Sequence, residues 1–591
     1  MALSTPSESP AVVVKEIDLT GGVPNVQSTT GATVINSTWG PVEQRVKISS
    51  EQELVDTFGA PDSATTFSFH RANFFLKYSN SLQTVRVIDS TAKNAVSTTG
   101  QTDASSPTAE VVKNTDDFNS QLSSLDTNLQ TFVARYPGAL GNSLQVSICP
   151  YSMGDSAFGN WSYKNEFDAA PGTSTFATNN NASNDEVHVA IIDKGGKFTG
   201  TQGTILERYA FASLGSNAKN TDGTTNYIKD IINGTSQYVW HIDFDSDFQN
   251  TSGDQAAAGT AIDSGDNFAK VTGTLNTDIN YNLAGGLNVD TLSTANILTG
   301  YDLFEDKDQV EIDFLIAPGM TARSDQTTVV NDLVATAQST RKDCVVVTSP
   351  SYSDVTNVNN ASTIVTNIVA TADTFTKSSY LVMDGNYLKV YDKFNDQYIE
   401  IPAASSTAGI MAATDLNRAP WFSPAGSRRG QYLGITSIPF TPTKSQRDTL
   451  YKAGVNPIAN IPGAGVILFG DKTKLARPSA FDRINVRRLF LVLERAISRA
   501  AEQVLFEFND EFTRAEFVNI VEPVLREVKG RRGITDFRVV ADETNNTPAV
   551  IDRNEFIASI FIKPARSINY VTLNFVAVRT GVDFEEVVGT V

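Results

Sequence analysis

The chain has 591 residues, of which 40% are hydrophobic and 19% are charged, and its formal net charge at pH 7 is −19. This length is too great for one hydrophobic core and predicts roughly three or four domains. The acidic excess argues against a general nucleic-acid-binding protein, because binding to phosphates needs positive potential.

Hydropathy and cysteine content set expectations about the compartment. No stretch approaches the run of about 20 apolar residues that spans a bilayer, and the start MALSTPSESP lacks the basic and apolar regions of a secretion signal. We therefore expect no direct membrane insertion. Cys149 and Cys344 lie in apolar, strand-like runs. This placement excludes a disulfide framework and permits a reducing compartment.

The first 91 residues are predicted to form an arm and the beginning of an α/β section. Residues 1–22 are rich in Ser and Pro around one extended piece that contains Val12, Val13 and Val14. From residue 23 to 91 the pattern predicts alternating strands and helices. The strands are expected at 31–36, 46–49 and 82–89, and the helices after a cap at Ser49 or Ser50 and at 67–78. This order suggests a sheet backed by helices.

Residues 92–300 are predicted to form a loop-rich outer region that contains β-strands. Ser, Thr, Asn and Asp dominate much of it, interleaved with apolar runs at 187–193 and 238–244. The pattern strengthens over 301–475, where EIDFLIAPG and CVVVTSP read as buried strands, each followed by an amphipathic helix. A βαβ order with strands buried on both faces predicts a parallel sheet.

Residues 476–580 are predicted to form a small α+β C-terminal domain. A helix over 482–508 carries an apolar stripe and, on another side, a polar stripe with Arg488, Arg495 and Arg499. A second helix over 514–528, a basic turn and three strand-like runs complete the domain. The arm 581–591 holds a short β-prone piece with no local partner, and such a strand either frays or pairs with another chain.

Motifs for catalysis, cofactors or metals are lacking, so the sequence predicts neither an enzyme nor a bound cofactor. His70, His188 and His241 have no metal-site or triad spacing. GAGVILFG at 463 and DKGGKFTG at 193 fail the dinucleotide and phosphate patterns and are predicted to be a tight connection and a hairpin turn. The acids at 243, 245 and 247 are interpreted as the exposed face of a strand, because Phe248 replaces the glycine of a calcium loop.

A basic segment stands out from the acidic chain. Between residues 471 and 538 there are 14 Lys/Arg and 11 Asp/Glu, a balance of 14 − 11 = +3. One interpretation is an ordinary solvated helix face. The other is an electrostatic docking face for an acidic partner, made by Arg488, Arg495, Arg499, Lys529, Arg531 and Arg532.

Short stretches along most of the chain share their order with a known family. They include TTGATVINSTWGPVEQRVKISSEQELVDTFGAP from residue 29, ARYPGALGNSLQVSI from 134, NRAPWFSPAGSRRG from 417 and NPIANIPGAGVILFGDKT from 456. In this order they resemble the contractile tail sheath proteins of bacteriophages, especially of T-even-like myophages. The loop-rich parts of 90–130 and 245–300 match little.

The resemblance implies a structural virion protein. Its expected fold is a subtilisin-like α/β core without catalytic residues, a loop-rich outer insertion and a C-terminal domain that faces a tail tube. The expected partners are further copies in stacked hexameric rings, the tail tube protein, and baseplate and tail terminator proteins, with no direct contact to nucleic acid. Assembly would take place in the host cytoplasm, and nucleotide-independent contraction would drive the tube through the host envelope for DNA delivery.

The resemblance also implies roles for both arms and for the basic segment. Strands would be donated to neighbouring subunits by Val12, Val13 and Val14 at one end of the chain and by Phe584, Val587 and Val588 at the other. The basic residues would hold the sheath on an acidic tube. Two alternatives stay open: the sheath of a headless contractile injection particle, and an α/β hydrolase.

Overall fold

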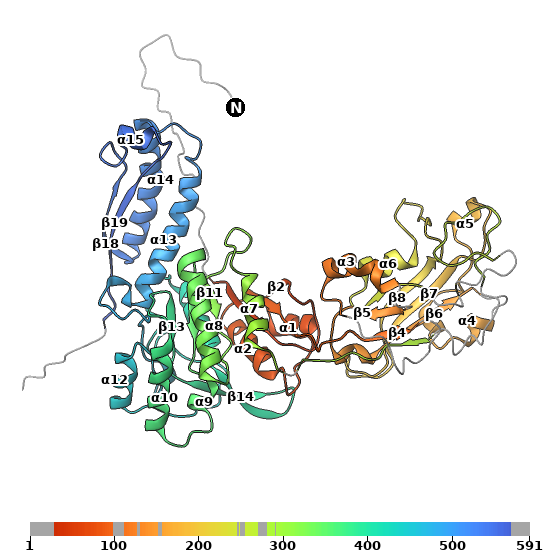
Figure 1. Ribbon diagram of the computed structural model, residues 1–591, viewed down its shortest axis with the longest axis horizontal. Coiled ribbons are helices and arrows are strands. Elements are labelled where there is room, and N and C mark those ends of the chain that lie inside the picture. Colours follow the sequence, from red (N-terminus) through yellow and green to blue (C-terminus); the bar gives the residue numbers. More distant parts are fainter. Residues whose placement is uncertain are drawn as a thin grey trace, which may run out of the picture. The chain divides into compact units, whose positions relative to one another are not determined.

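The computed structural model describes residues 29–98, 111–126, 130–151, 156–244, 248, 255–269, 280–289 and 291–568. The described residues form two compact units (Figure 1). The C-terminal unit comprises 420–423 and 488–568, and the core unit comprises the remainder. The arms that hold Val12 to Val14 and Phe584 to Val588 lie outside the described residues. Among the described residues, no helix is long and apolar enough to cross a membrane.

A six-stranded sheet with the order β13-β12-β11-β1-β3-β2 organises the core unit. All neighbouring pairs are parallel except β2 with β3. The predicted parallel sheet is therefore confirmed. The strands are β1 (Gly31–Ile35), β2 (Arg45–Ile48), β3 (Leu82–Arg86), β11 (Phe314–Ile316), β12 (Val345–Thr348) and β13 (Leu381–Met383).

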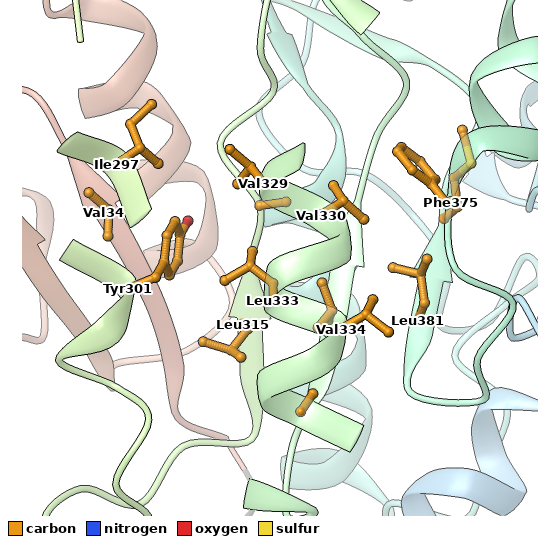
Figure 2. Close-up of a cluster of buried hydrophobic side chains, with 14 of the residues drawn as sticks. Val34, Ile297, Tyr301, Leu315, Val329, Val330, Leu333, Val334, Phe375 and Leu381 are labelled. Atoms are coloured by element: carbon orange, nitrogen blue, oxygen red, sulfur yellow. The ribbon is translucent and has the colours of Figure 1, made fainter. Parts of the chain in front are cut away.

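Helices cover both faces of this sheet. Val34 of β1 packs in an apolar cluster with Leu333 of α8 and Tyr301 of α7 (Figure 2). Thr33, which precedes Val34 in β1, accepts a hydrogen bond from Arg71 of α2 on the opposite face of the sheet. Burial on both faces explains why the strands read as continuous apolar runs. The helices that contact the sheet are α2 (Thr66–Leu76), α7 (Thr294–Asp302), α8 (Arg323–Ala335) and α11 (Ala404–Asn417).

Local signals account for several of the core elements. The predicted cap is Ser50, whose side chain accepts from the Glu53 amide at the start of α1 (Glu51–Phe58). Helix α8 continues into one π-helical segment, Thr336–Arg341. The remaining elements are α9 (Tyr352–Val355), α10 (Ala361–Thr374), α12 (Lys444–Lys452), and the hairpins β14 (Tyr387–Asp392) with β15 (Gln397–Pro402) and β16 (Ile458–Ile461) with β17 (Gly465–Leu468).

The residues between β3 and α7 contain two antiparallel sheets, of order β10-β6-β7-β8 and β4-β5-β9. The predicted turn at Asp193 joins β7 to β8 as a hairpin. The strands are β4 (Val96–Thr98), β5 (Gln130–Ala134), β6 (Leu144–Pro150), β7 (Glu186–Asp193), β8 (Thr204–Ser213), β9 (Val239–His241) and β10 (Asn280–Asn282). The helices are α3 (Thr115–Asp126), α4 (Ser156–Asn160), α5 (Thr175–Asn179) and α6 (Ile228–Thr235).

The C-terminal unit contains an antiparallel helix pair and a two-stranded sheet (Figure 1). Its elements are α13 (Ile484–Glu502, which begins in the core unit), α14 (Glu511–Gly530), β18 (Ile534–Val540), α15 (Pro548–Ile551) and β19 (Ser559–Pro564). The prediction of one helix to residue 508 is wrong, because α13 ends at Glu502. Beyond it the backbone turns, with Phe506 at a φ of 70°, and Asp510 caps α14 by accepting from the Thr513 amide.

Candidate assembly surfaces of the C-terminal unit

The three arginines predicted to form one polar stripe on α13 differ in exposure. Arg488 has only 4% of its surface exposed, whereas Arg495 and Arg499 are half-buried. All three take part in interactions with other groups of the protein. Because Arg488 is buried, little of its side chain is accessible to a partner protein. The basic surface that α13 can present lies near Arg495 and Arg499.

The other three predicted basic residues lie together at the end of α14, with Lys529 in its last turn and Arg531 and Arg532 just after it. Lys529 Nζ is 3.1 Å from Asp536 Oδ1, and Arg531 Nη1 is 3.3 Å from Glu527 Oε1. The Arg531 guanidinium also stacks over the Trp421 ring, 5.1 Å from its centroid. Arg532 is exposed and makes no ion pair with any described residue.

The antiparallel course of α13 and α14 separates the predicted basic residues. The turn at 529–532 lies near the first turns of α13, whereas Arg499 belongs to its last turn. Eleven residues of helix separate Arg488 from Arg499, which is about 16 Å at 1.5 Å per residue. Two basic surfaces are therefore present at different heights along the helix pair.

The β18–β19 hairpin presents two edges for strand pairing. Its register places Arg538 opposite Phe561 and Asp536 opposite Lys563. Among the described residues, neither outer edge pairs with a third strand. Unpaired edges leave rows of backbone amide and carbonyl groups that can accept a strand from another chain.

The three histidines are buried in the fold. His188 donates from Nε2 to the Ala169 carbonyl and accepts at Nδ1 from the Phe211 amide, which fixes a neutral tautomer. His70 Nε2 lies 3.1 Å from Asp392 Oδ1 in a buried pair. Burial lowers the pKa of His241 to about 3. No group of acids, histidines or cysteines among the described residues could hold a metal ion.

Asp384 is a buried acid that the sequence did not single out. It follows β13 at the carboxyl edge of the parallel sheet and accepts from Ser349 Oγ at 2.8 Å and from Thr407 Oγ1 at 3.0 Å. Burial raises its pKa to about 7, and the hydrogen bonds only partly oppose this rise. No histidine contacts Asp384 within the described chain. The hydrogen bonds from Ser349 and Thr407 connect the ends of β12 and β13 to α11.

Replacing Asp384 with Asn should make stability less dependent on pH. The pKa of Asp384 is higher in the folded protein than in the unfolded chain. The free energy of unfolding therefore falls as pH rises from about 4 to about 7. The full difference in pKa corresponds to about 4 kcal/mol in the free energy of unfolding. We expect Asp384→Asn to raise the thermal unfolding temperature at pH 8.5 and to give no gain at pH 4. An equal shift at both values would mean that ionisation of Asp384 is not the cause.

Sequence reasoning missed one exposed feature of the unit. Leu505, Phe506, Phe508 and Phe512 are all exposed, although the apolar stripe predicted for the helix over 482–508 included Phe508. The sequence signal was Asn509-Asp510, a pair of helix-capping residues between the two expected helices.

Comparison with known proteins gives concordant matches along the chain. The family model for the phage tail sheath protein central domain matches residues 290–474, and that for the phage tail sheath C-terminal domain matches 476–577. The chain is 31% identical to the tail sheath protein of Vibrio phage KVP40 and 32% identical to that of Enterobacteria phage T4. Each alignment covers 98% of this chain and 99% of the relative.

One solved structure shares the fold across most of the chain. The sheath tail protein of Desulfitobacterium hafniense superposes with a TM-score of 0.51 at 12% identity, and the match covers 94% of this chain and 100% of that chain. At this identity the likeness concerns the fold alone.

Proposed function

The chain belongs to the phage tail sheath family, and we propose that it forms the contractile sheath around the tail tube of a phage. The main support is the sequence identity of 31% and 32% to two phage tail sheath proteins over 98% of the chain. Contraction would convert an extended lattice of subunits into a shorter, wider one with more contacts, without consuming a nucleotide. The movement would push the tube through the host envelope.

The proposed architecture assigns separate tasks to the parts of the chain. Residues 23–91 and 301–475 would form a subtilisin-like core without catalytic residues, and 92–300 the outer region. Residues 476–580 would face the tube. The parallel sheet of the core unit supports the first assignment. We propose no enzymatic activity, since neither the histidines nor Asp384 belongs to a recognisable catalytic set.

The arms 1–22 and 581–591 would link neighbouring copies. Each would add a strand to a β18–β19 hairpin of another subunit, through Val12 to Val14 or through Phe584, Val587 and Val588. The two edges of the hairpin that pair with no other described strand support this role. Main-chain hydrogen bonds make few demands on side-chain fit, so such links could persist while subunits pivot.

The further partners would be the tail tube, baseplate and tail terminator proteins. Arg495, Arg499, Lys529, Arg531 and Arg532 would contact an acidic tube, with Arg488 supporting α13 from its buried position. The separation of the two basic surfaces along the helix pair suggests contacts at two heights. These contacts must be weak enough to release on contraction.

Charge reversal should separate tube docking from self-assembly. We expect Arg495→Glu/Arg499→Glu/Arg532→Glu to reduce assembly on purified tail tubes by at least tenfold at physiological salt. Self-assembly without tubes should persist. Unchanged co-sedimentation of the variant with tubes would favour the interpretation of an ordinary solvated helix face. The control is Arg208→Glu, which reverses the charge at an exposed site distant in the sequence.

Negative-stain imaging of the purified chain tests the proposed function. We expect tubes of uniform diameter at high protein concentration. Monomers that remain monodisperse under the same conditions would contradict it. Imaging of the native particle then separates a phage from a headless injection particle by the presence of a filled head.

A further inference from the structure

An ordered loop of the C-terminal unit directs large apolar side chains into solvent. We call Leu505, Phe506, Phe508 and Phe512 the apolar loop, since the first three lie between α13 and α14 and the last in the first turn of α14. Their exposed fractions are 61%, 104%, 84% and 77%. A cluster of this kind on a folded protein marks an interaction site.

Hydrogen bonds fix this loop in place. Asn509 Nδ2 donates to the Glu555 carbonyl at 2.8 Å, and Arg514 Nη1 donates to Asn509 Oδ1 at 3.0 Å. Asp510 caps α14, and Phe506 adopts a φ of 70° that is unfavourable for a bulky residue. The outward direction of the rings is therefore built into the fold.

The charge around the apolar loop restricts what can cover it. From residue 501 to 513 the chain has four acids and no Lys or Arg. The acids are Glu502, Glu507, Asp510 and Glu511. An occupant must therefore offer apolar surface together with positive charge.

The outer face of the β18–β19 hairpin has those two properties. Phe561 in β19 is 61% exposed, and Ile568, in the segment that follows the end of β19, is 82% exposed. Phe561 lies opposite Arg538 in the hairpin register, and Lys563, two residues along, projects to the same face. Arg538, Lys563 and Arg566 are exposed and make no ion pair with any described residue. We call these five residues the hairpin face. The exposed Asp536, opposite Lys563 on the same face, is paired with Lys529 at 3.1 Å, so the positive charges outnumber it.

We propose that the apolar loop of one copy docks on the hairpin face of a second copy. The two surfaces differ, so the contact is heterologous and repeats from copy to copy into a ring or a helix. The inference rests on the proposed function for the existence of a multi-copy assembly, and it adds a side-chain contact distinct from strand donation.

The chain ends fit the apolar loop poorly. Residues 1–28 contain three acids and one Lys, and residues 569–591 contain three acids and one Arg. Either segment would bring negative charge against Glu507 and Glu511. The hairpin face of another copy brings positive charge to the same place.

Two cysteine variants of the full chain test this contact directly. Phe508→Cys and Phe561→Cys proteins are mixed and oxidised, against a background in which Cys149 and Cys344 are buried. A disulfide-linked dimer is expected in the mixture, at a yield at least fivefold above either variant alone. A mixture that gives no more dimer than the single variants overturns the proposal.

Charge exchange tests the same contact during assembly. Glu507→Lys/Glu511→Lys and Arg538→Glu/Lys563→Glu should each lower tube yield at least tenfold at an unchanged melting temperature. Co-assembly of the two variants is expected to restore tube yield, because the loop of each variant then meets a hairpin face of opposite charge on the other. Combining all four changes in one chain should restore it as well. The control Asp168→Lys/Asp302→Lys changes exposed acids of the core unit and should assemble normally.

The outcomes separate the contact from the sheath function. Cross-linking without tubes would support the contact and contradict the proposed function. Tubes that form normally from the charge variants would overturn the contact and leave the function standing. Loss of assembly on tail tubes alone, with normal tube-free assembly, would assign the apolar loop to the tube protein and also overturn the proposal.

Discussion

A chain that ends at Gly581 is expected to fold normally and to fail to form tubes. If the terminal segment is a strand donated to a neighbour, its hydrogen bonds and the apolar faces of Phe584, Val587 and Val588 are satisfied only across the interface. On that proposal, removing the segment would delete little buried area from its own subunit. The melting temperature of the monomer should therefore stay within a few degrees of the full-length value.

On the proposed strand donation the loss of assembly should be nearly complete, because each subunit would lose a backbone-mediated link that repeats throughout the lattice. Deletion of Met1–Thr20 should give the same result. The two deletions together should be no worse than either alone if both strands join one shared sheet. Sedimentation and negative staining measure the yield. Tubes from the shortened chain at full-length yield and concentration would mean that the lattice is linked in another way.

Replacement of Arg71 with Met is expected to destabilise the core unit severely. The guanidinium is fully enclosed, donating to the Val34 and Pro318 carbonyls and, at 3.3 Å, to Thr33 Oγ1. Burial lowers the pKa of Arg71. The methionine would fill most of the volume but leave these buried acceptors without a donor, at about 1–3 kcal/mol each. We therefore expect a loss of about 3–5 kcal/mol in the free energy of unfolding.

Arg208→Met is the matched control for Arg71→Met. Its guanidinium is 3.3 Å from Glu166 at an exposed site. Exposed ion pairs contribute about 0–1 kcal/mol, so this change should have little effect. Denaturant unfolding of the two variants measures the difference. Equal effects would show that the hydrogen bonds of Arg71 do not hold α2 against β1.

The core sheet was predictable because its strands carry a pattern that needs no knowledge of distant residues. EIDFLIAPG and CVVVTSP are apolar throughout, and the helix after each has one apolar side. Strands buried on both faces have this pattern. The enclosed position of Arg71 could not be predicted, since its acceptors are carbonyls at 34 and 318 that only the tertiary fold brings together.

The candidate surfaces were less predictable than the core. Helical periodicity places Arg488, Arg495 and Arg499 near one another on a helical wheel. It does not show which side of the helix another part of the protein covers. Tertiary packing buries Arg488 and leaves the other two half-exposed. In the same way, the apolar periodicity of the sequence continues to residue 508, whereas α13 ends at Glu502 and Asp510 caps α14. The role of the arms stays a prediction.

Electron microscopy of particles built from this chain, before and after contraction is triggered in nucleotide-free buffer, tests the contractile function most directly. We expect an extended sheath of uniform diameter that becomes shorter and wider while the inner tube keeps its length. Sheaths that keep the same length and diameter after triggering, or that change only when a nucleotide is supplied, would contradict it.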